Sequence, residues 1–223
     1  MICASIIESG IGSMVNIANS IDSDIIELRL DCLSEFSGLE KLKDIRKEKI
    51  VTCMPSWEGG NFGGQEGERF EILNKAIGFA EFVTIELRAK KKYRDELIKR
   101  AKEIGVKVII AYHDFDSTPE RKEIMKILNR ERDSRADIAK VAFMANDYKD
   151  VLNLMQVLVD KNLDEKFGIP IIALSMGKPG RISRVLAPLL GSYLTFASVE
   201  RGRESAEGQL TVNELRKILK ILG

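Results

Sequence analysis

Two hydrophobic periodicities alternate along the chain. Short runs rich in β-branched and apolar residues, typical of strands, alternate with longer stretches rich in Lys, Glu and Leu, in which apolar positions recur at helical spacing. The short runs predict strands at Ile2–Ile7, Asp24–Leu30, Lys49–Met54, Phe82–Leu87, Val106–His113, Asp137–Phe143, Pro170–Met176 and Tyr193–Ser198. The longer stretches predict helices at Gly12–Ser20, Gly38–Lys47, Gln65–Phe79, Lys92–Ile104, Pro119–Arg132, Asp147–Lys161, Arg181–Leu190 and Val212–Leu222.

Local signals mark several helix ends. Thr118 and Pro119 predict an N-cap followed by proline at the first helical position. Thr211 and Glu214 predict a capping box at the start of the last helix. Gly105 is placed to end the helix that precedes the fifth strand.

Eight strands, each followed by a helix, predict a closed (β/α)8 TIM barrel, a fold that usually takes ~250 residues. The chain has 223 residues, so we expect a compact barrel that forms a single domain over residues 1–223. The first strand begins at residue 2, and we therefore expect no N-terminal segment that covers the barrel floor. An open doubly wound sheet is disfavoured, because the stretch 9–12 carries only part of the usual glycine fingerprint.

Charge and hydropathy exclude several classes of protein. Lys+Arg is 35 and Asp+Glu is 34, and this balance argues against nucleic acid bound through a basic surface. No apolar run reaches the roughly 18 residues of a membrane-spanning helix. The first residues lack the basic start of a signal peptide, and the three cysteines form no C-x-x-C pair. We therefore expect a cytoplasmic protein without a membrane partner, a disulfide framework or a zinc site.

Lys140 is the most informative single residue. In a TIM barrel, reactive groups lie at the carboxyl ends of the strands and in the loops that follow. Lys140 lies inside the apolar sixth strand, where burial would lower its pKa because the charged form is penalised. A neutral amine condenses with ketones or aldehydes to form an imine. The alternative is a lysine that faces outward and extends past the helices.

His113 is the only histidine, and it ends the fifth strand. An imidazole at this position is a candidate proton shuttle at neutral pH. Glu86, at the end of the fourth strand, is the candidate to orient the ring. The alternatives are a packed core histidine and a structural ion pair between Glu86 and Arg88.

Two glycine-rich segments follow strand ends. The segment 177–184 combines glycines, a helix start and basic residues, and predicts an anion site in which Arg184 holds a carboxylate or phosphate. The alternative is an ordinary loop with solvated charges. The segment 55–64 predicts a loop that closes over the site.

An imine-forming lysine beside a histidine base implies proton abstraction next to a carbonyl group, with the iminium as electron sink. Aldol cleavage, isomerisation and β-elimination of water all use this chemistry. The spacing of the residues does not separate these reactions.

Seven motifs occur in a fixed order over nearly the whole chain: Glu27–Asp31, Thr84–Leu87, Tyr112–Phe115, Ala136–Ala142, Ser175–Gly177 with Ile182–Arg184, Thr195–Ala197 and Ser205–Gln209. Together they resemble the type I 3-dehydroquinate dehydratases, the Schiff-base family of the shikimate pathway, which supplies aromatic amino acids.

The resemblance implies a lyase mechanism and a set of site residues. Lys140 would form an imine with the C3 ketone of 3-dehydroquinate. His113, positioned by Glu86, would move the C2 proton to the departing C1 hydroxyl in a syn elimination that yields 3-dehydroshikimate. The substrate contacts would be Ser5, Glu27, Arg29, Arg184, Ser205 and Gln209, with Met176 and Phe196 as apolar walls. The resemblance also implies a homodimer that needs no cofactor.

The sequence departs from the family pattern at two positions. Met54 stands where the family usually has arginine, so one substrate contact is either absent or made by another cation such as Arg69 or Arg88. Glu207 stands where the lid loop usually has proline, and we expect a looser lid with lower affinity.

Three other functions remain as alternatives. A class I aldolase or transaldolase-like barrel would also use an imine-forming lysine on the sixth strand. A metal-dependent lyase would use Glu27, Asp31, Glu86 and His113 as ligands, but a single histidine makes a poor transition-metal site. A non-catalytic binding barrel is suggested by Met54 alone.

Overall fold

A computed structural model describes residues 1–222 of the chain. Its eight parallel strands lie within the ranges expected from the sequence, or extend them by one residue. They are β1 (Ile2–Ile6), β2 (Ile25–Arg29), β3 (Lys49–Thr52), β4 (Phe82–Glu86), β5 (Lys107–Asp114), β6 (Ile138–Met144), β7 (Ile171–Met176) and β8 (Thr195–Ser198).

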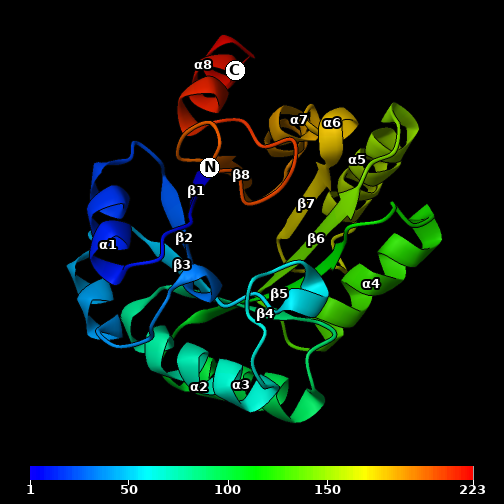
Figure 1. Cartoon of the computed structure of the whole chain (residues 1–223). Helices are drawn as coiled ribbons and strands as arrows, with labels where there is room; N and C mark the ends of the chain where they lie inside the picture. Colours follow the sequence, from blue (N-terminus) through cyan, green and yellow to red (C-terminus); the bar gives the residue numbers. More distant parts are fainter. Residues whose placement is uncertain (223) are drawn as a thin grey trace.

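The strands follow one another around a barrel (Figure 1). Each pairs in parallel with the strand before it, and β8 returns to pair with β1, so the sheet order is β7-β6-β5-β4-β3-β2-β1-β8. Only the seam between β7 and β8 lacks a strand ladder within residues 1–222. A backbone hydrogen bond of 2.8 Å from Tyr193 N to Ile171 O joins the two sides of this seam. The predicted TIM barrel is confirmed.

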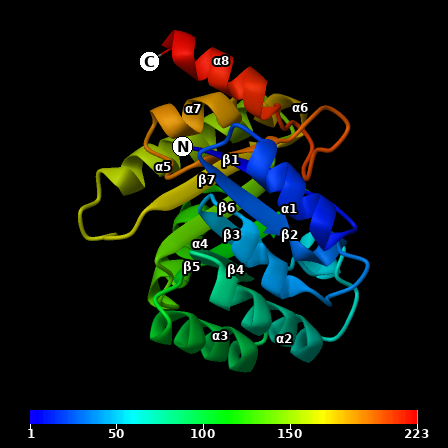
Figure 2. The ribbon, with the colours of Figure 1, turned by 90° about the vertical axis from the view of Figure 1, so that its left-hand side faces the viewer.

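Helices form the outer layer around the strands (Figures 1 and 2). The α-helices are α1 (Ile11–Ser20), α2 (Glu66–Ala76), α3 (Lys91–Glu103), α4 (Arg121–Asp133), α5 (Tyr148–Asn162), α6 (Gly177–Gly180), α7 (Ser183–Leu189) and α8 (Val212–Leu222). Short 3-10 helices are η1 (Leu30–Cys32), η2 (Leu39–Asp44), η3 (Ser56–Glu58) and η4 (Ile77–Phe79). None of these described helices has the length and hydrophobicity to cross a membrane.

Two predicted helices differ from the structure. The segment 38–47 forms the 3-10 helix η2, whose buried residues Leu39 and Leu42 are three positions apart and so share one face at three residues per turn. The segment 181–190 contributes the shorter α7, which follows the four-residue helix α6.

The predicted helix ends are confirmed at two of three positions. Thr211 and Glu214 exchange hydrogen bonds as a capping box, and Gly105 takes a left-handed conformation with a φ of 78° after α3. The predicted N-cap at Thr118 is wrong, because α4 begins at Arg121. The Thr118 hydroxyl instead donates to the Met144 carbonyl at 2.7 Å and fastens the loop to the end of β6.

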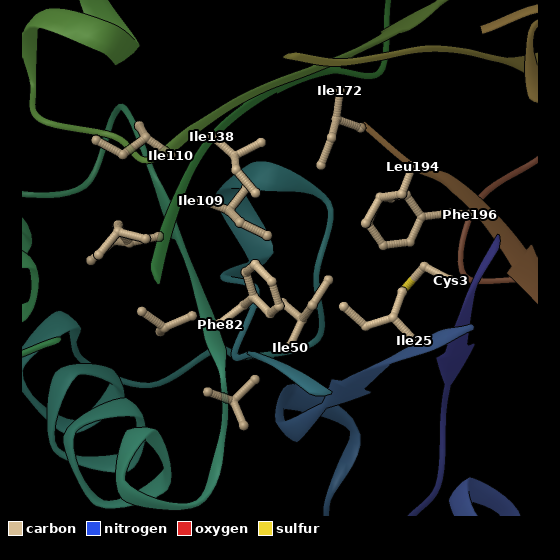
Figure 3. Packing of buried hydrophobic residues seen from close by; sticks show 14 of the residues in the cluster. Cys3, Ile25, Ile50, Phe82, Ile109, Ile110, Ile138, Ile172, Leu194 and Phe196 are labelled. Atoms are coloured by element: carbon tan, nitrogen blue, oxygen red, sulfur yellow. The ribbon is translucent and has the colours of Figure 1, made fainter. Parts of the chain in front are cut away.

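Side-chain alternation divides the barrel interior into layers. Residues two apart on a strand face the same side. Apolar side chains from all eight strands meet in the layer shown in Figure 3: Cys3, Ile25, Ile50, Phe82, Ile109, Ile138, Ile172 and Phe196. Two residues further along β1, β2, β3 and β6 stand Ser5, Glu27, Thr52 and Lys140. The polar layer therefore begins directly above an apolar floor.

Glu131 is a buried acidic residue in the layer between the barrel and the helices. It lies on α4 and is completely buried, and neither carboxyl oxygen has a hydrogen-bond partner within residues 1–222. Burial, which disfavours the charged form, raises the pKa of Glu131 well above 4.5.

Replacement of Glu131 by Gln should stabilise the protein in a pH-dependent way. The folded chain holds a proton that the unfolded chain loses above pH 4.5, so the wild type loses stability as pH rises from there toward the raised pKa. We expect Glu131→Gln to raise Tm by about 5 °C near pH 7.5, with a much smaller gain near pH 5. Thermal unfolding followed by circular dichroism measures both values.

The exposed Glu123 on the same helix provides the control. Glu123→Gln should leave Tm nearly unchanged at either pH. An equal gain at both pH values for Glu131→Gln would show that packing, rather than ionisation, separates the two side chains.

Candidate active site

Lys140 lies inside the barrel and faces an anchored carboxylate. Its Nζ atom is 3.8 Å from Oε1 of Glu27 and 4.1 Å from the centre of the Phe196 ring. The register pairs Ser5 on β1 with Glu27 on β2, and the Ser5 hydroxyl donates to Oε2 of Glu27 at 2.7 Å. The Thr52 hydroxyl donates to Oε1 at 3.0 Å. These bonds fix the carboxylate beside the amine.

Burial and neighbouring charges shift the pKa values of Lys140 and Glu27 in opposite directions. Burial lowers the pKa of Lys140, and the nearby Glu27 carboxylate only partly offsets that effect. Burial alone would raise the pKa of Glu27, but Lys140, Arg29 and the hydroxyl donors outweigh it and lower the pKa. The pair therefore combines an amine that gives up its proton readily with a carboxylate that stays ionised. The outward-facing alternative for Lys140 is wrong.

His113 shares the interior face with Lys140. Lys140 pairs in register with Ala111, two residues before His113 on β5, so both side chains point into the barrel. Burial lowers the pKa of His113, and Lys140 lowers it further, while the neighbouring Glu58 carboxylate raises it. The ring is therefore predominantly neutral at neutral pH and able to accept a proton.

Glu58, rather than Glu86, lies against His113. Oε1 of Glu58 accepts the His113 backbone N–H at 2.7 Å and stands 3.4 Å from Nδ1 of the ring. Glu86 instead accepts a hydrogen bond from Arg69 at 2.5 Å. The expected contact of Glu86 with His113, and its alternative ion pair with Arg88, are both wrong. Burial raises the pKa of Glu86 to about 7, even with Arg69 beside it.

The glycine-rich loop after β3 delivers Glu58 to this position. Gly59 has a φ of 83°, and a Cβ there would collide with the Phe115 ring. A Cβ on Gly60 would collide with the Met54 carbonyl. The loop is thus packed closely against the end of β5, and the Glu58 carboxylate is buried.

Arg184, on the helix that follows β7, brings a cation without a carboxylate partner to the cavity wall. It is the second residue of α7 and is 3% exposed, its Nε has no hydrogen-bond partner, and no carboxylate pairs with it among residues 1–222. Burial lowers its pKa to about 10. The preceding Ser183 anchors the helix start through hydrogen bonds with the backbone of Ser175 and Gly180. An unpaired buried guanidinium is suited to bind an anion.

The loop between β8 and α8 closes the site from above. Within it, Ser205 N donates to the Gln209 side chain at 2.8 Å, and the Gln209 amide returns a hydrogen bond to the Ser205 hydroxyl at 2.8 Å. Glu207 is exposed, but its carbonyl accepts Gly177 N at 3.2 Å. The backbone at Glu207 is therefore anchored in spite of the missing proline, and the affinity expected from this departure stays a prediction.

One cavity, of about 490 Å³ with the open space at its mouth included, collects most of the predicted residues. Its walls include Glu27, Arg29, His113, Lys140, Met176, Arg184, Phe196, Ser205 and Gln209. Thr52, Phe115, Ala142, Leu174 and Ala206 also line it and were missed by the sequence reasoning. Ser5 and Glu86 lie outside the cavity wall. Ser5 instead donates a hydrogen bond to Glu27.

Arg69 and Arg88, the cations expected to replace the missing arginine, form ion pairs outside the cavity. Met54 lines the cavity, whereas neither Arg69 nor Arg88 does. Arg69 is bound to Glu66 and Glu86, and Arg88 is bound to Glu58. The expectation that Arg69 or Arg88 takes over the lost contact is therefore wrong. Arg29, which does line the cavity, is held by Asp31 through two hydrogen bonds of 2.6 and 2.9 Å.

The arrangement supports carbonyl chemistry on a small anion. Lys140 supplies a nucleophilic amine, His113 a neutral base on the same interior face, and Arg184 an anchor for a negative group. The carboxylates suggested as metal ligands are instead bound to cations: Asp31 to Arg29 and Glu86 to Arg69.

Comparisons with known proteins agree with this geometry. The family model of type I 3-dehydroquinase matches residues 2–223. A 3-dehydroquinate dehydratase of Methanocaldococcus jannaschii is 38% identical over 227 residues, which cover 100% of this chain and 99% of the relative. One from Methanosarcina acetivorans is 40% identical and covers 90% of this chain and 86% of the relative.

Solved structures give the same result. The type I 3-dehydroquinate dehydratase of Clostridium difficile, crystallised with covalently modified comenic acid, has a TM-score of 0.88 at 29% identity and covers 99% of this chain and 91% of its own. The enzyme of Geobacillus kaustophilus has a TM-score of 0.90 at 26% identity, with coverage of 99% and 90%. With a family model that spans residues 2–223 and relatives that match end to end, the chain belongs to the type I 3-dehydroquinase family.

Proposed function

We propose that this protein removes water from 3-dehydroquinate to give 3-dehydroshikimate, a lyase step of the shikimate pathway toward aromatic amino acids. The observation that carries the proposal is the buried Lys140 amine, whose pKa is lowered by burial, in one cavity with His113 and the unpaired Arg184. A ketone acid of this size presents one group to each of these side chains.

The reaction begins with the Lys140 amine. The amine adds to the C3 ketone and water leaves, so that a protonated imine forms. His113 then takes the proton from C2, and the electron pair of that C–H bond moves into the iminium to form an enamine. The enamine pushes out the C1 hydroxyl, which takes the proton from His113 and departs as water. Hydrolysis of the imine releases the product and restores the amine.

Glu58 takes the positioning role that the sequence suggested for Glu86. Its carboxylate fixes the His113 backbone and faces Nδ1, which leaves Nε2 as the nitrogen directed at the substrate. Because the charge of Glu58 raises the pKa of His113, it also makes the ring a better base.

The remaining residues bind the ring of the substrate. No carboxylate among residues 1–222 pairs with Arg184, which binds the substrate carboxylate. Glu27 and Arg29 bind ring hydroxyls, and Ser5 acts through Glu27. Ser205 and Gln209 cover the substrate, while Met176 and Phe196 form apolar walls.

We further propose that the protein acts as a homodimer in the cytoplasm and needs neither a cofactor nor a metal ion. Exposed apolar side chains on neighbouring helices support the dimer: Tyr148 and Leu152 lie one turn apart on α5, and Ile182 borders the same depression as Tyr148.

Borohydride trapping tests the covalent step. Wild-type protein treated with borohydride and 3-dehydroquinate should gain the mass of the reduced substrate or product on the peptide that contains Lys140, and formation of the conjugated product should stop. Lys140→Met should show neither the adduct nor turnover. The exposed Lys149 is the control, and Lys149→Met should behave as wild type. Turnover without an adduct at Lys140 would exclude the proposed mechanism.

Nuclear magnetic resonance of the single histidine tests which carboxylate positions it. Glu58 raises the pKa of His113, so Glu58→Gln should lower that pKa. Glu86→Gln should change it little, because Glu86 is bound to Arg69. Titration of the His113 ring signals measures both variants, and a larger effect of Glu86→Gln would return the positioning role to that residue.

Replacement of Met54 by arginine tests the lost substrate contact. Met54 lines the cavity, so an arginine there would add a charged hydrogen bond to the substrate. We expect Met54→Arg to lower KM about tenfold, with a smaller change in kcat. Met54→Leu preserves the volume and should leave KM unchanged. An unchanged kcat/KM for Met54→Arg would argue that no contact is missing.

A further inference from the structure

Arg88 connects three parts of the site without lining the cavity. It follows β4 and extends toward the loop after β3. Its Nε and Nη2 atoms lie 2.8 and 2.7 Å from Oε2 of Glu58. The same Nη2 donates to the backbone carbonyl of His113 at 3.1 Å. One guanidinium thus joins the ends of β4 and β5 to the loop that carries Glu58.

The two oxygens of Glu58 have separate partners. Oε2 is occupied by Arg88, and Oε1 is left to the backbone N–H and ring of His113. Rotation of the carboxylate would break the hydrogen bonds on both sides. The guanidinium therefore fixes which oxygen faces the ring and the angle at which it does so.

Two aromatic rings restrict the guanidinium itself. Its central carbon lies 4.7 Å from the centre of the Tyr112 ring and 5.8 Å from that of Trp57. Tyr112 directly precedes His113, and Trp57 directly precedes Glu58. Although the Arg88 side chain is 42% exposed, cation–π contact with both rings holds it in this orientation.

The surrounding charges leave no substitute for Arg88. Glu58 and Glu86 are both buried, and the charge of Glu58 raises the pKa of Glu86. Arg69 is already bound to Glu86. Loss of the Arg88 guanidinium would leave the Glu58 carboxylate without an opposite charge beside it in a buried site.

We propose that Arg88 is a positioning residue for the dehydration step, acting through Glu58 on His113. The inference rests on the function proposed above. Because Arg88 lies outside the cavity, its loss should slow proton transfer by His113 while substrate binding and imine formation at Lys140 continue.

Steady-state kinetics of Arg88→Met and Arg88→Lys provide the first test. Arg88→Met keeps the length of the side chain but removes the charge, and kcat should fall about 10- to 100-fold with KM nearly unchanged. Arg88→Lys restores a charge and one donor and should recover a large part of kcat. Arg94→Met is the matched control. Arg94 donates to the neighbouring Leu87 carbonyl but does not contact Glu58, so this variant should have wild-type kcat and KM.

A double-mutant cycle tests whether Arg88 acts through Glu58. If it does, Arg88→Met should cost little further activity once Glu58→Gln is present, and the two effects should be non-additive. Borohydride trapping adds an independent readout. During turnover, Arg88→Met should accumulate more substrate-mass adduct on Lys140 than wild type, because the step after imine formation is the slow one.

The outcomes separate the two proposals. No adduct on Lys140 in the wild type would overturn the proposed function. A normal wild-type adduct together with unchanged kcat in Arg88→Met, a loss confined to KM, or full additivity with Glu58→Gln would overturn the role of Arg88 alone. Circular dichroism and Tm identify a variant that fails to fold, and Arg88→Lys then carries the test.

Discussion

The site depends on the cost of burying one ammonium group. Lys140 lies in the barrel interior directly above an apolar layer, and burial lowers its pKa. A single carboxylate at 3.8 Å, itself held by two hydroxyl groups, offsets only part of that cost. A closer pair would keep the lysine charged and unreactive, whereas no pair would leave Glu27 as an isolated buried charge. The distance of 3.8 Å between Lys140 and Glu27 therefore keeps the amine nucleophilic and still gives the buried carboxylate a nearby partner.

Pairing of buried charges organises the rest of the barrel mouth. Asp31 is bound to Arg29, Glu86 to Arg69 and Glu58 to Arg88. Arg184 breaks this rule, since no internal carboxylate compensates it among residues 1–222. These three paired carboxylates lie outside the cavity wall, which Arg184 lines, so the cavity presents an uncompensated cation to an anion on that side. Substrate orientation follows from that asymmetry.

Much of this arrangement could be predicted from strand periodicity. Alternation places Lys140 and His113 inside the barrel, and both occupy the cavity. The same alternation correctly points Glu86 inward, yet cannot reveal that Arg69, from a helix earlier in the chain, binds it. Glu58 was missed for a related reason. Its position depends on how a glycine-rich loop folds back onto β5, and local sequence patterns do not encode that contact.

The seam between β7 and β8 lacks the strand ladder that joins every other pair of neighbouring strands within residues 1–222. The strands that carry Lys140 and His113 share a continuous ladder of backbone pairs, so the distance between amine and imidazole is fixed by the stiffest part of the sheet. Arg184 follows β7 and the Ser205–Gln209 loop follows β8, on the two sides of a boundary bridged by the Tyr193–Ile171 bond. Two further hydrogen bonds cross the boundary, from Gly177 N to the Glu207 carbonyl and from the Thr195 hydroxyl to the Arg184 carbonyl. The residues that bind the substrate are thus joined by separate hydrogen bonds, whereas the residues that react with it share one ladder of strand pairs.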